Sequence, residues 1–201
     1  EGGILGSVVP ALTGRVLGAL RMFCSARFLT VGPGLKSGIK LRLDNPAQLG
    51  AELLCGAVAA LEEGPGPLAV ISADTAISIM AVNGKQELVG GVILPGPQLS
   101  LSALVQKTAQ LPQIDLSAPA SSSILGKNTS ACLQNGFVLG TAGLLDGLAE
   151  RFQAELGPDI RFYATGNLPR TIREACRTPI EYREYLITDG LYRIWQKNRK
   201  G

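Results

Sequence analysis

The chain has 201 residues, of which 46% are apolar and 17% are charged, and its formal net charge is +3. This length predicts one large domain or two small ones, and the composition supports a substantial core and argues against disorder. Aromatic residues make up only 5% of the chain and the basic residues are dispersed. A nucleic-acid-binding protein needs a basic face with interleaved aromatics, so this class is excluded.

The chain contains no histidine, which excludes several kinds of chemistry. Histidine acid–base catalysis, serine–histidine or cysteine–histidine nucleophiles and imidazole zinc sites all need that residue. No apolar run approaches the roughly 20 residues of a membrane helix, so we expect no membrane contact. The cysteines lie far apart among apolar or helical residues, and we expect buried free thiols, typical of a cytoplasmic protein: Cys24, Cys55, Cys132 and Cys176.

The first part of the chain has the pattern of a parallel α/β sheet. Apolar residues predict a strand over residues 4–9, a helix over 12–23 and a second strand over 28–31. A glycine-rich loop follows at residues 32–38, at the carboxyl end of a strand, where open α/β sheets bind ligands. Its permissive backbone and free N–H groups favour an anionic ligand.

A helix is predicted to begin at Pro46, because the preceding Asp44-Asn45 can cap it and proline suits the first helical position. Glu52 is the one carboxylate in its apolar segment, residues 49–61. We place the substrate site here. Two interpretations of Glu52 stay open, a functional carboxylate and an exposed helix residue, and the sequence alone favours the second. Lys36 in the glycine loop either neutralises an anion or is solvated.

The Gly-Pro-Gly-Pro sequence at residues 64–67 predicts a domain boundary. A three-stranded meander is expected after it, over residues 68–72, 77–82 and 87–94, with a hairpin turn at Asn83-Gly84 and a bulge at Gly90-Gly91. The turn with Asp74 and Thr75 either cradles a phosphate or is ordinary turn chemistry, and both interpretations stay open.

The last part of the chain is predicted to be mainly helical. Gly136, Gly140 and Gly143 share one face of the longest helix, which predicts close helix packing in a core or a dimer interface. Residues 126–129 look like the end of a P-loop, but a helix cap explains them better. The basic residues at 197–200 predict a solvated terminus. The expected elements are helices over residues 99–109, 128–156 and 191–198, and a strand over 161–164 that ends in a Thr165-Gly166-Asn167 turn.

Several short motifs follow one another along the chain: Ser7-Val8-Val9-Pro10, residues 31–38, Asp44-Asn45-Pro46 with Gly50-Ala51, Gly90-Gly91 with Pro95-Gly96, residues 107–112, residues 126–129, and Ala164-Thr165-Gly166. In this order they resemble the type III pantothenate kinases of the acetate kinase/sugar kinase/Hsp70/actin superfamily. The resemblance implies an α/β fold of two actin-like (ribonuclease H-like) domains. Residues 1–66 would be the remainder of an incomplete N-terminal domain and residues 67–201 the C-terminal domain.

The resemblance also implies a reaction, the ATP-dependent phosphorylation of pantothenate to 4'-phosphopantothenate, the first step of coenzyme A biosynthesis. It implies Mg²⁺ and a monovalent cation, K⁺ or NH₄⁺, and a homodimer or a heterodimer with a related subunit. Glu52 would be the catalytic base, Thr75 and Gly166 would bind ATP, and Ser72 would stand at the monovalent-cation position. The pantothenate side would be formed by Gly50, Ala51, Leu53 and Thr108.

Some of these positions depart from the family pattern. Glu52 and Leu53 replace an aspartate and an arginine, and Ser72 and Asp74 replace an aspartate and a glycine. A side chain displaced by about 1 Å can cost on the order of 100-fold in rate. In an alternative interpretation, the chain is a catalytically impaired homologue of these kinases and acts as a non-catalytic or regulatory subunit.

Overall fold

The computed structural model describes residues 2–118, 120 and 123–199. Its helices are α1 (Pro10–Phe23), the 3₁₀ turn η1 (Pro46–Gln48), α2 (Ala51–Glu62), α3 (Pro97–Gln106), α4 (Thr129–Leu156), α5 (Arg170–Ala175) and α6 (Leu186–Asn198). Its strands are β1 (Gly2–Leu5), β2 (Arg27–Thr30), β3 (Lys40–Leu41), β4 (Leu68–Ala73), β5 (Ala76–Val82), β6 (Glu87–Pro95), β7 (Arg161–Gly166) and β8 (Ile180–Tyr182). None of the described helices is both long and apolar enough to cross a membrane.

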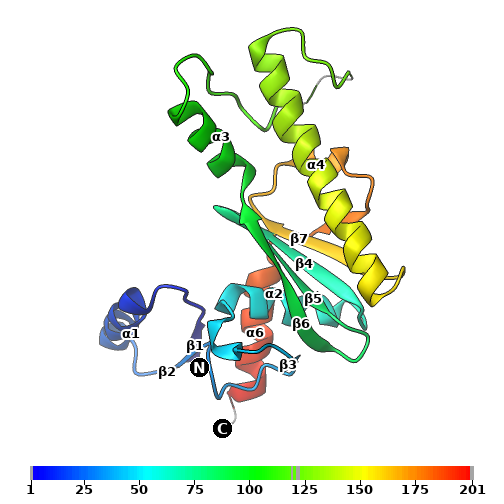
Figure 1. The fold of residues 1–201 in the computed structure, drawn as a ribbon. Coiled ribbons are helices and arrows are strands. Elements are labelled where there is room, and N and C mark those ends of the chain that lie inside the picture. The colour runs from blue at the N-terminus through cyan, green and yellow to red at the C-terminus, as the bar shows by residue number, and fades with distance from the viewer. Residues whose placement is uncertain (1, 119, 121–122, 200–201) are drawn as a thin grey trace.

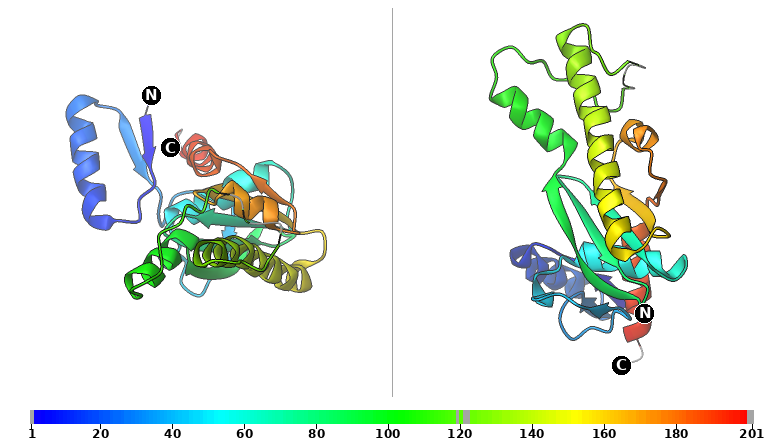
Figure 2. Two further views of the ribbon diagram at one scale, coloured as in Figure 1. Left: turned by 90° about the horizontal axis from the view of Figure 1, so that it is seen from above. Right: turned by 45° about the vertical axis from the view of Figure 1, so that its right-hand side comes forward.

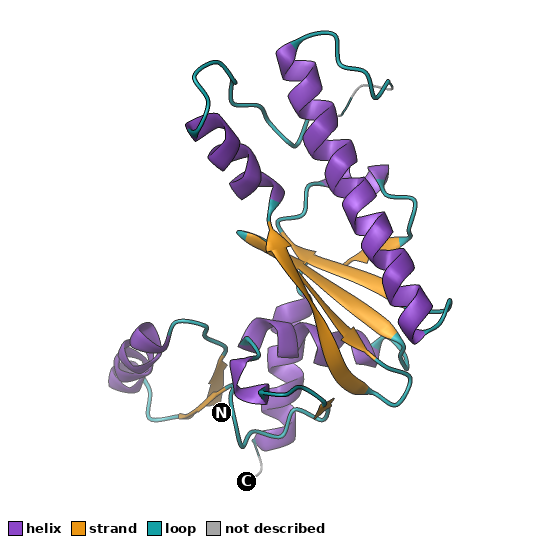
Figure 3. Cartoon of the chain, viewed as in Figure 1, coloured by secondary structure: helices purple, strands orange, loops and turns teal. Residues whose placement is uncertain are grey.

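A mixed six-stranded sheet forms the centre of the molecule, with the strand order β3-β6-β5-β4-β7-β8 (Figure 3). β4, β5 and β6 form the expected antiparallel meander, while β7 runs parallel to β4 and β8 runs parallel to β7. β4 is buried along its whole length. Such burial requires cover on both faces of the sheet.

Helices provide this cover, with α2 and α6 on one face and α4 and α5 on the other (Figure 1). Successive side chains of a strand point to opposite faces. Leu68 and Val70 of β4 therefore join the core under α2 and α6, while Ala69 and Ile71 join the core under α4. Every position of β4 is apolar up to Ser72, as a strand buried on both faces requires.

The first two strands and α1 lie apart from this sheet (Figure 2). β1 and β2 pair in parallel, as the sequence predicts, but they form a separate two-stranded sheet. The strand predicted over residues 4–9 ends at Leu5. α1 leaves its apolar side in solvent, with Leu12 51%, Val16 41% and Phe23 89% exposed.

The meander confirms two local predictions. The ladder between β5 and β6 shifts register at Ala81/Val82, opposite Gly90, so the predicted bulge is present. The β5–β6 connection begins at Asn83, whose Oδ1 accepts hydrogen bonds from the Lys85 and Glu87 amides at 2.9 and 3.0 Å. Its left-handed residue is Gln86, with a φ of 59°, rather than Gly84.

Two helix predictions need correction, and two short elements are new. No helix begins at Pro46: the chain makes only the 3₁₀ turn η1, the Asn45 side chain caps nothing, and α2 begins after Gly50. α6 begins at Leu186 rather than residue 191. α5 and β8 were not predicted, because both are too short to show a hydrophobic period.

The predicted environments of the cysteines and glycines are partly wrong. Cys55 is buried, but Cys24 and Cys132 are exposed, and Cys176 is half-buried. Gly136, Gly140 and Gly143 contact no helix in the described chain, since a Cβ added at each would meet nothing within 4 Å. The prediction of close packing inside a core is therefore wrong, and the interface alternative stays a prediction.

The cap prediction at the start of α4 is confirmed. Asn128 precedes the helix, and its Oδ1 accepts a hydrogen bond from the Ala131 amide at 2.9 Å. The predicted division into residues 1–66 and 67–201 stays a prediction. The core under α2 and α6 contains residues from both sides of it, including Val58 and Ile194.

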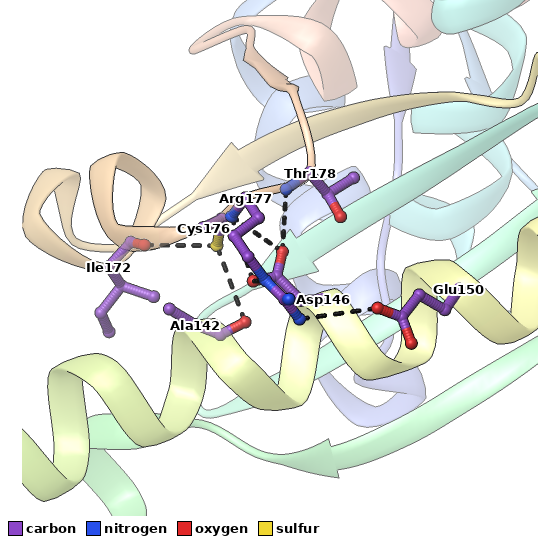
Figure 4. A network of polar contacts seen from close by, with 7 residues as sticks. All are labelled: Ala142, Asp146, Glu150, Ile172, Cys176, Arg177 and Thr178. Carbon is purple, nitrogen blue, oxygen red and sulfur yellow. Dashed lines mark hydrogen bonds and ion pairs between the residues drawn. The ribbon is translucent and has the colours of Figure 1, made fainter.

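A buried carboxylate fixes α4 to the segment after α5 (Figure 4). Asp146 of α4 is 3% exposed and accepts hydrogen bonds from the backbone amides of Arg177 and Thr178 at 2.9–3.0 Å. Burial opposes its ionisation, but the hydrogen bonds outweigh burial and lower its pKa. The chain between α5 and β8 thus has a fixed path across the sheet.

Candidate active site

The glycine loop, η1 and the start of α2 surround a pocket of about 480 Å³. Gly34, Leu35 and Ser37 line it from the loop, and Gly50 and Ala51 line it from the helix. The sequence placed a substrate site on residues 31–61, and the structure brings the two halves of that segment to one cavity. A cavity of this size suits a small organic molecule.

The loop reaches this shape through two left-handed glycines, Gly34 and Gly38, each with a φ of 87°. Residues with a Cβ rarely adopt this conformation. Ser37 shapes the exit of the loop, because its Oγ donates to the Ile39 carbonyl and accepts from the Ile39 amide at 3.1 and 3.3 Å. The pocket wall therefore combines the main chain of the loop with apolar side chains such as Leu35 and Leu49, which suits a ligand with both polar and apolar parts.

The start of α2 separates the residues predicted there. Gly50 and Ala51 face the pocket, whereas Leu53 is buried at 8% exposure in the core under α2 and α6. Glu52 is exposed and lines a smaller cavity of about 170 Å³, next to Cys55. Burial raises the pKa of the Cys55 thiol to about 12, so that thiol stays neutral. Glu52 is thus the ionisable side chain that α2 presents at this end.

Contacts at the C-terminal end of α2 give the direction of this helix over the sheet. Arg161, at the start of β7, donates hydrogen bonds to the carbonyls of Glu63 and Gly64 at 3.3 and 2.8 Å, just after α2 ends. The C-terminal end of α2 therefore lies over the beginnings of β4 and β7. Its first turn points toward the opposite edge, where Thr75 and Gly166 lie.

At that edge the β4–β5 turn meets the end of β7. Gly166 pairs with Ala73 across the parallel ladder and has a φ of 81°. A Cβ there would lie 2.3 Å from the Ala73 carbonyl oxygen, so only glycine fits. The side-chain Nδ2 of Asn167, the next residue, donates a hydrogen bond to the Asp74 carboxylate at 2.9 Å. The two turns that the sequence linked to ATP are thus in contact.

A row of hydroxyl side chains crosses the sheet beside these turns. Ser72 of β4 is opposite Ser78 of β5 and opposite Thr165 of β7. Directly opposed residues point to the same face of a sheet, so the three hydroxyls gather on the α2 side. All three are buried, at 9%, 8% and 1% exposure. Neutral oxygens in this arrangement are suitable ligands for a hard cation.

Thr108 stands apart from all of these residues. It follows α3, which leaves β6 and extends away from the sheet (Figure 1). Its hydroxyl donates to the Leu104 carbonyl at 3.0 Å and the residue is exposed. Within this chain, Thr108 does not contact the pocket formed by the glycine loop.

Comparison with known proteins identifies the family of this chain. A family model described as Type III pantothenate kinase matches residues 1–151. Curated proteins with that name include one from Koribacter versatilis, 36% identical over 199 residues that cover 99% of this chain and 72% of the relative. Another, from Pelobacter propionicus, is 36% identical over 199 residues that cover 99% of this chain and 78% of the relative. The chain belongs to the type III pantothenate kinase family.

A solved structure supports the family fold. A Baf family transcriptional activator from Campylobacter jejuni matches with a TM-score of 0.60 and 20% identity, over 98% of this chain and 83% of its own. At this identity the likeness concerns the fold alone. With the family membership it confirms the predicted α/β actin-like fold. The curated relatives from Koribacter versatilis and Pelobacter propionicus are described as kinases, which gives no support to the alternative of a non-catalytic subunit.

A kinase needs ATP and a divalent metal, so we ask whether the side chains of this chain could bind that metal. In the described part of the chain, no three side chains of histidine, cysteine, aspartate or glutamate converge on one point. Mg²⁺ in kinases needs less, since one or two carboxylates and the nucleotide phosphates complete its coordination. Asp74 offers one carboxylate at the β4–β5 turn, so the residues fit an ion that arrives with the nucleotide.

Sequence reasoning gave no role to three contributors to this site, Thr165, Asn167 and Ser78. Asn167 binds Asp74, and Ser78 extends the row of hydroxyls next to Ser72. Asn167 follows a strand in a Thr-Gly-Asn turn, so its position carried a signal. Ser78 carried none, because its place opposite Ser72 depends on the register of the meander.

Proposed function

We propose that this chain phosphorylates pantothenate, using ATP as the phosphoryl donor. The observation that carries the proposal is the pocket that the glycine loop and the start of α2 enclose, in a chain that belongs to the type III pantothenate kinase family. Catalysis of phosphoryl transfer consists mainly of positioning and charge neutralisation. A chain without histidine can therefore perform it.

In this proposal ATP phosphates lie against the turns that carry Thr75 and Gly166. The close fit of Gly166 to the Ala73 carbonyl leaves no side chain between the turns, so phosphate oxygens can approach the main chain. The Thr75 hydroxyl would donate to a phosphate oxygen. Mg²⁺, held by Asp74 with the phosphates, would supply neutralisation of their charge.

We propose that the Ser72 row holds the monovalent cation, K⁺ or NH₄⁺. Three buried hydroxyls can replace part of the hydration shell of such an ion without adding negative charge. The row lies at the edge of the sheet next to the proposed phosphate turns. A cation here would add to the positive potential that attracts ATP.

Pantothenate would occupy the pocket of about 480 Å³, with its carboxylate toward the glycine-loop main chain and its hydroxyl toward α2. Gly50 and Ala51 leave room for it, while Leu53 acts from the core by supporting the helix. Glu52 would accept the hydroxyl proton as the phosphoryl group is transferred. Glu52 is exposed, so a substrate can reach its carboxylate.

Thr108 would act in an assembly of two chains. Thr108 follows α3 and does not contact the pocket of its own chain. Because it is exposed, it is accessible to a second chain. We propose a homodimer in which Thr108 reaches the pantothenate site of the partner. A heterodimer with a related subunit is the second possible assembly, and analytical ultracentrifugation with mixed chains separates the two.

Coupled ADP release with pantothenate as substrate tests the proposed function. We expect turnover that depends on pantothenate, and we expect Glu52→Ala to lower kcat by about 100-fold or more. Glu62→Ala is the matched control, because Glu62 is an exposed glutamate at the far end of the same helix. Equal activity of the two variants would remove Glu52 from the mechanism, and turnover independent of pantothenate would refute the proposed substrate.

A further inference from the structure

The end of α6 is bound to the glycine loop by an amide-to-backbone clasp. Asn198 accepts a hydrogen bond from the Lys36 amide on its Oδ1 at 3.1 Å and donates from Nδ2 to the Lys36 carbonyl at 2.9 Å. The same Nδ2 donates to the Ile194 carbonyl at 2.7 Å. Asn198 thus pairs with both main-chain groups of one loop residue while it stays attached to its own helix.

Neighbouring contacts strengthen this clasp. The Lys197 ammonium lies 3.4 Å from the Ser37 carbonyl, and a Cβ on Gly38 would overlap the Lys197 side chain. Residues 197–200 were predicted to be a solvated terminus. Lys197 and Arg199 are exposed, as predicted, whereas Asn198 is half-buried and the prediction is wrong there; residue 200 lies outside the described residues. The glycine loop is therefore held from behind by a helix 162 residues further along the chain.

The loop needs such support. It contains no regular hydrogen-bonded element between β2 and β3, and two of its residues are left-handed glycines with wide conformational freedom. Leu35 and Ser37, on either side of the clasped Lys36, line the pocket. A change in the position of the Lys36 backbone would therefore move both pocket-lining neighbours.

We propose that Asn198 is a positioning residue that holds the glycine loop in the shape that binds pantothenate. The proposal rests on the proposed function, since it assumes that pantothenate occupies the glycine-loop pocket. Asn198 contacts no ligand and acts through Lys36. Its loss should weaken pantothenate binding and leave ATP binding unchanged, because the ATP turns belong to a different part of the sheet.

Calorimetric titration of Asn198→Ala with pantothenate and with ATP tests this split. Two ordinary hydrogen bonds correspond to roughly a tenfold change in an equilibrium constant, so we expect the Kd for pantothenate to rise about tenfold. The Kd for ATP should change by less than about twofold. Gln196→Ala, two residues earlier on α6 and outside the loop contacts, should leave both constants unchanged. An unchanged Kd for pantothenate in Asn198→Ala would overturn the proposal.

Hydrogen exchange tests the clasp without any ligand. The Lys36 amide should lose protection in Asn198→Ala and keep it in Gln196→Ala, and unchanged protection in Asn198→Ala would overturn the proposal. If Asn198→Ala does not fold, Asn198→Asp replaces it. That variant keeps an acceptor for the Lys36 amide but cannot donate to the Lys36 carbonyl. Because one of the two hydrogen bonds is lost, we expect the Kd for pantothenate to rise about threefold, and an unchanged Kd would overturn the proposal.

A pocket variant separates this inference from the proposed function. Gly50→Leu places a side chain in the wall of the pocket, where a Cβ has its nearest neighbour at 3.6 Å and fits. If Gly50→Leu leaves pantothenate binding intact, the pocket is not the pantothenate site and the proposed function fails at that point. If Gly50→Leu abolishes binding while Asn198→Ala does not affect it, only the positioning role is refuted.

Discussion

The buried carboxylate of Asp146 shows how much one side chain can determine at the scale of the residue. Its oxygens accept from the backbone amides of Arg177 and Thr178, and no other described contact ties that segment to α4 as directly (Figure 4). In Asp146→Asn an amide donor would face these N–H groups. We expect a loss of about 2–3 kcal/mol in the free energy of unfolding, measured by urea denaturation.

Glu150→Gln is the control for that change. Glu150 also contacts Arg177, at 3.5 Å, but its side chain is 67% exposed. An exposed pair contributes about 0.5 kcal/mol or less, so this variant should unfold like the parent chain. Equal destabilisation of both variants would show that the Arg177 guanidinium, rather than the backbone amides, is the important partner.

The lowered pKa of Asp146 gives stability a defined pH dependence. The folded state binds the proton of this carboxyl less tightly than the unfolded state does. Its contribution to stability is therefore complete above the ordinary pKa of an aspartate and is lost as the pH falls through the lowered folded value. Denaturation midpoints should fall more steeply below about pH 4 in the parent chain than in Asp146→Asn. Parallel curves would contradict this assignment.

The cysteines differ in their environments, which predicts different reactivity. The pKa of the Cys55 thiol is raised to about 12 by burial, whereas Cys24 is exposed. Because the thiolate is the reactive form, iodoacetamide at neutral pH should label Cys24 at least about 100-fold faster than Cys55. Mass spectrometry of the labelled chain measures both rates, and comparable labelling would mean that α2 opens readily.

At the scale of the element, the glycines of α4 and α6 have opposite surroundings. A Cβ at Gly140 meets nothing within 4 Å, while one at Gly190 would overlap the Cys55 backbone where α6 crosses α2. Gly140→Ala should therefore raise the free energy of unfolding by about 0.5–1 kcal/mol through helix propensity. Gly190→Ala should lower it by about 1–3 kcal/mol through overpacking. Thermal unfolding of the two variants measures both changes in stability, and each variant serves as the control for the other.

Gly140→Ala has a second possible outcome that concerns assembly. If the exposed glycine face of α4 is the interface of a dimer, the added methyl group would weaken that dimer. Sedimentation at several concentrations would then show more monomer than in the parent chain. A stabilised chain with unchanged association would place the dimer interface elsewhere.

At the scale of the whole molecule, α1 leaves a row of apolar side chains uncovered. Leu12, Val16, Leu20 and Phe23 follow one another at helical spacing and are all exposed. Contiguous apolar surface of this kind promotes association. We expect the 201-residue chain to self-associate with rising concentration, and the double variant Leu12→Lys, Leu20→Lys to reduce this association. Light scattering measures it, and a monodisperse monomer in both cases would contradict the expectation.

The elements with a strong local signal were predictable from the sequence alone. Alternating and continuous apolar patterns identified the β4–β5–β6 meander, and Asn128 identified the start of α4, because these features depend on neighbouring residues in the chain. Ordered motifs also identified the family. The Asp44-Asn45-Pro46 signal gave only a 3₁₀ turn, because the chain must bend at Leu49 and Gly50 to enclose the pocket.

Tertiary structure alone decided how the parts of the site meet. The pocket between the glycine loop and the start of α2 follows from the way the chain folds back after η1. The row formed by Ser72, Ser78 and Thr165 follows from strand register. The clasp between Asn198 and Lys36 joins residues 162 positions apart. Contacts at such separations leave no periodic or local pattern, because chain folding rather than neighbouring residues brings their atoms together.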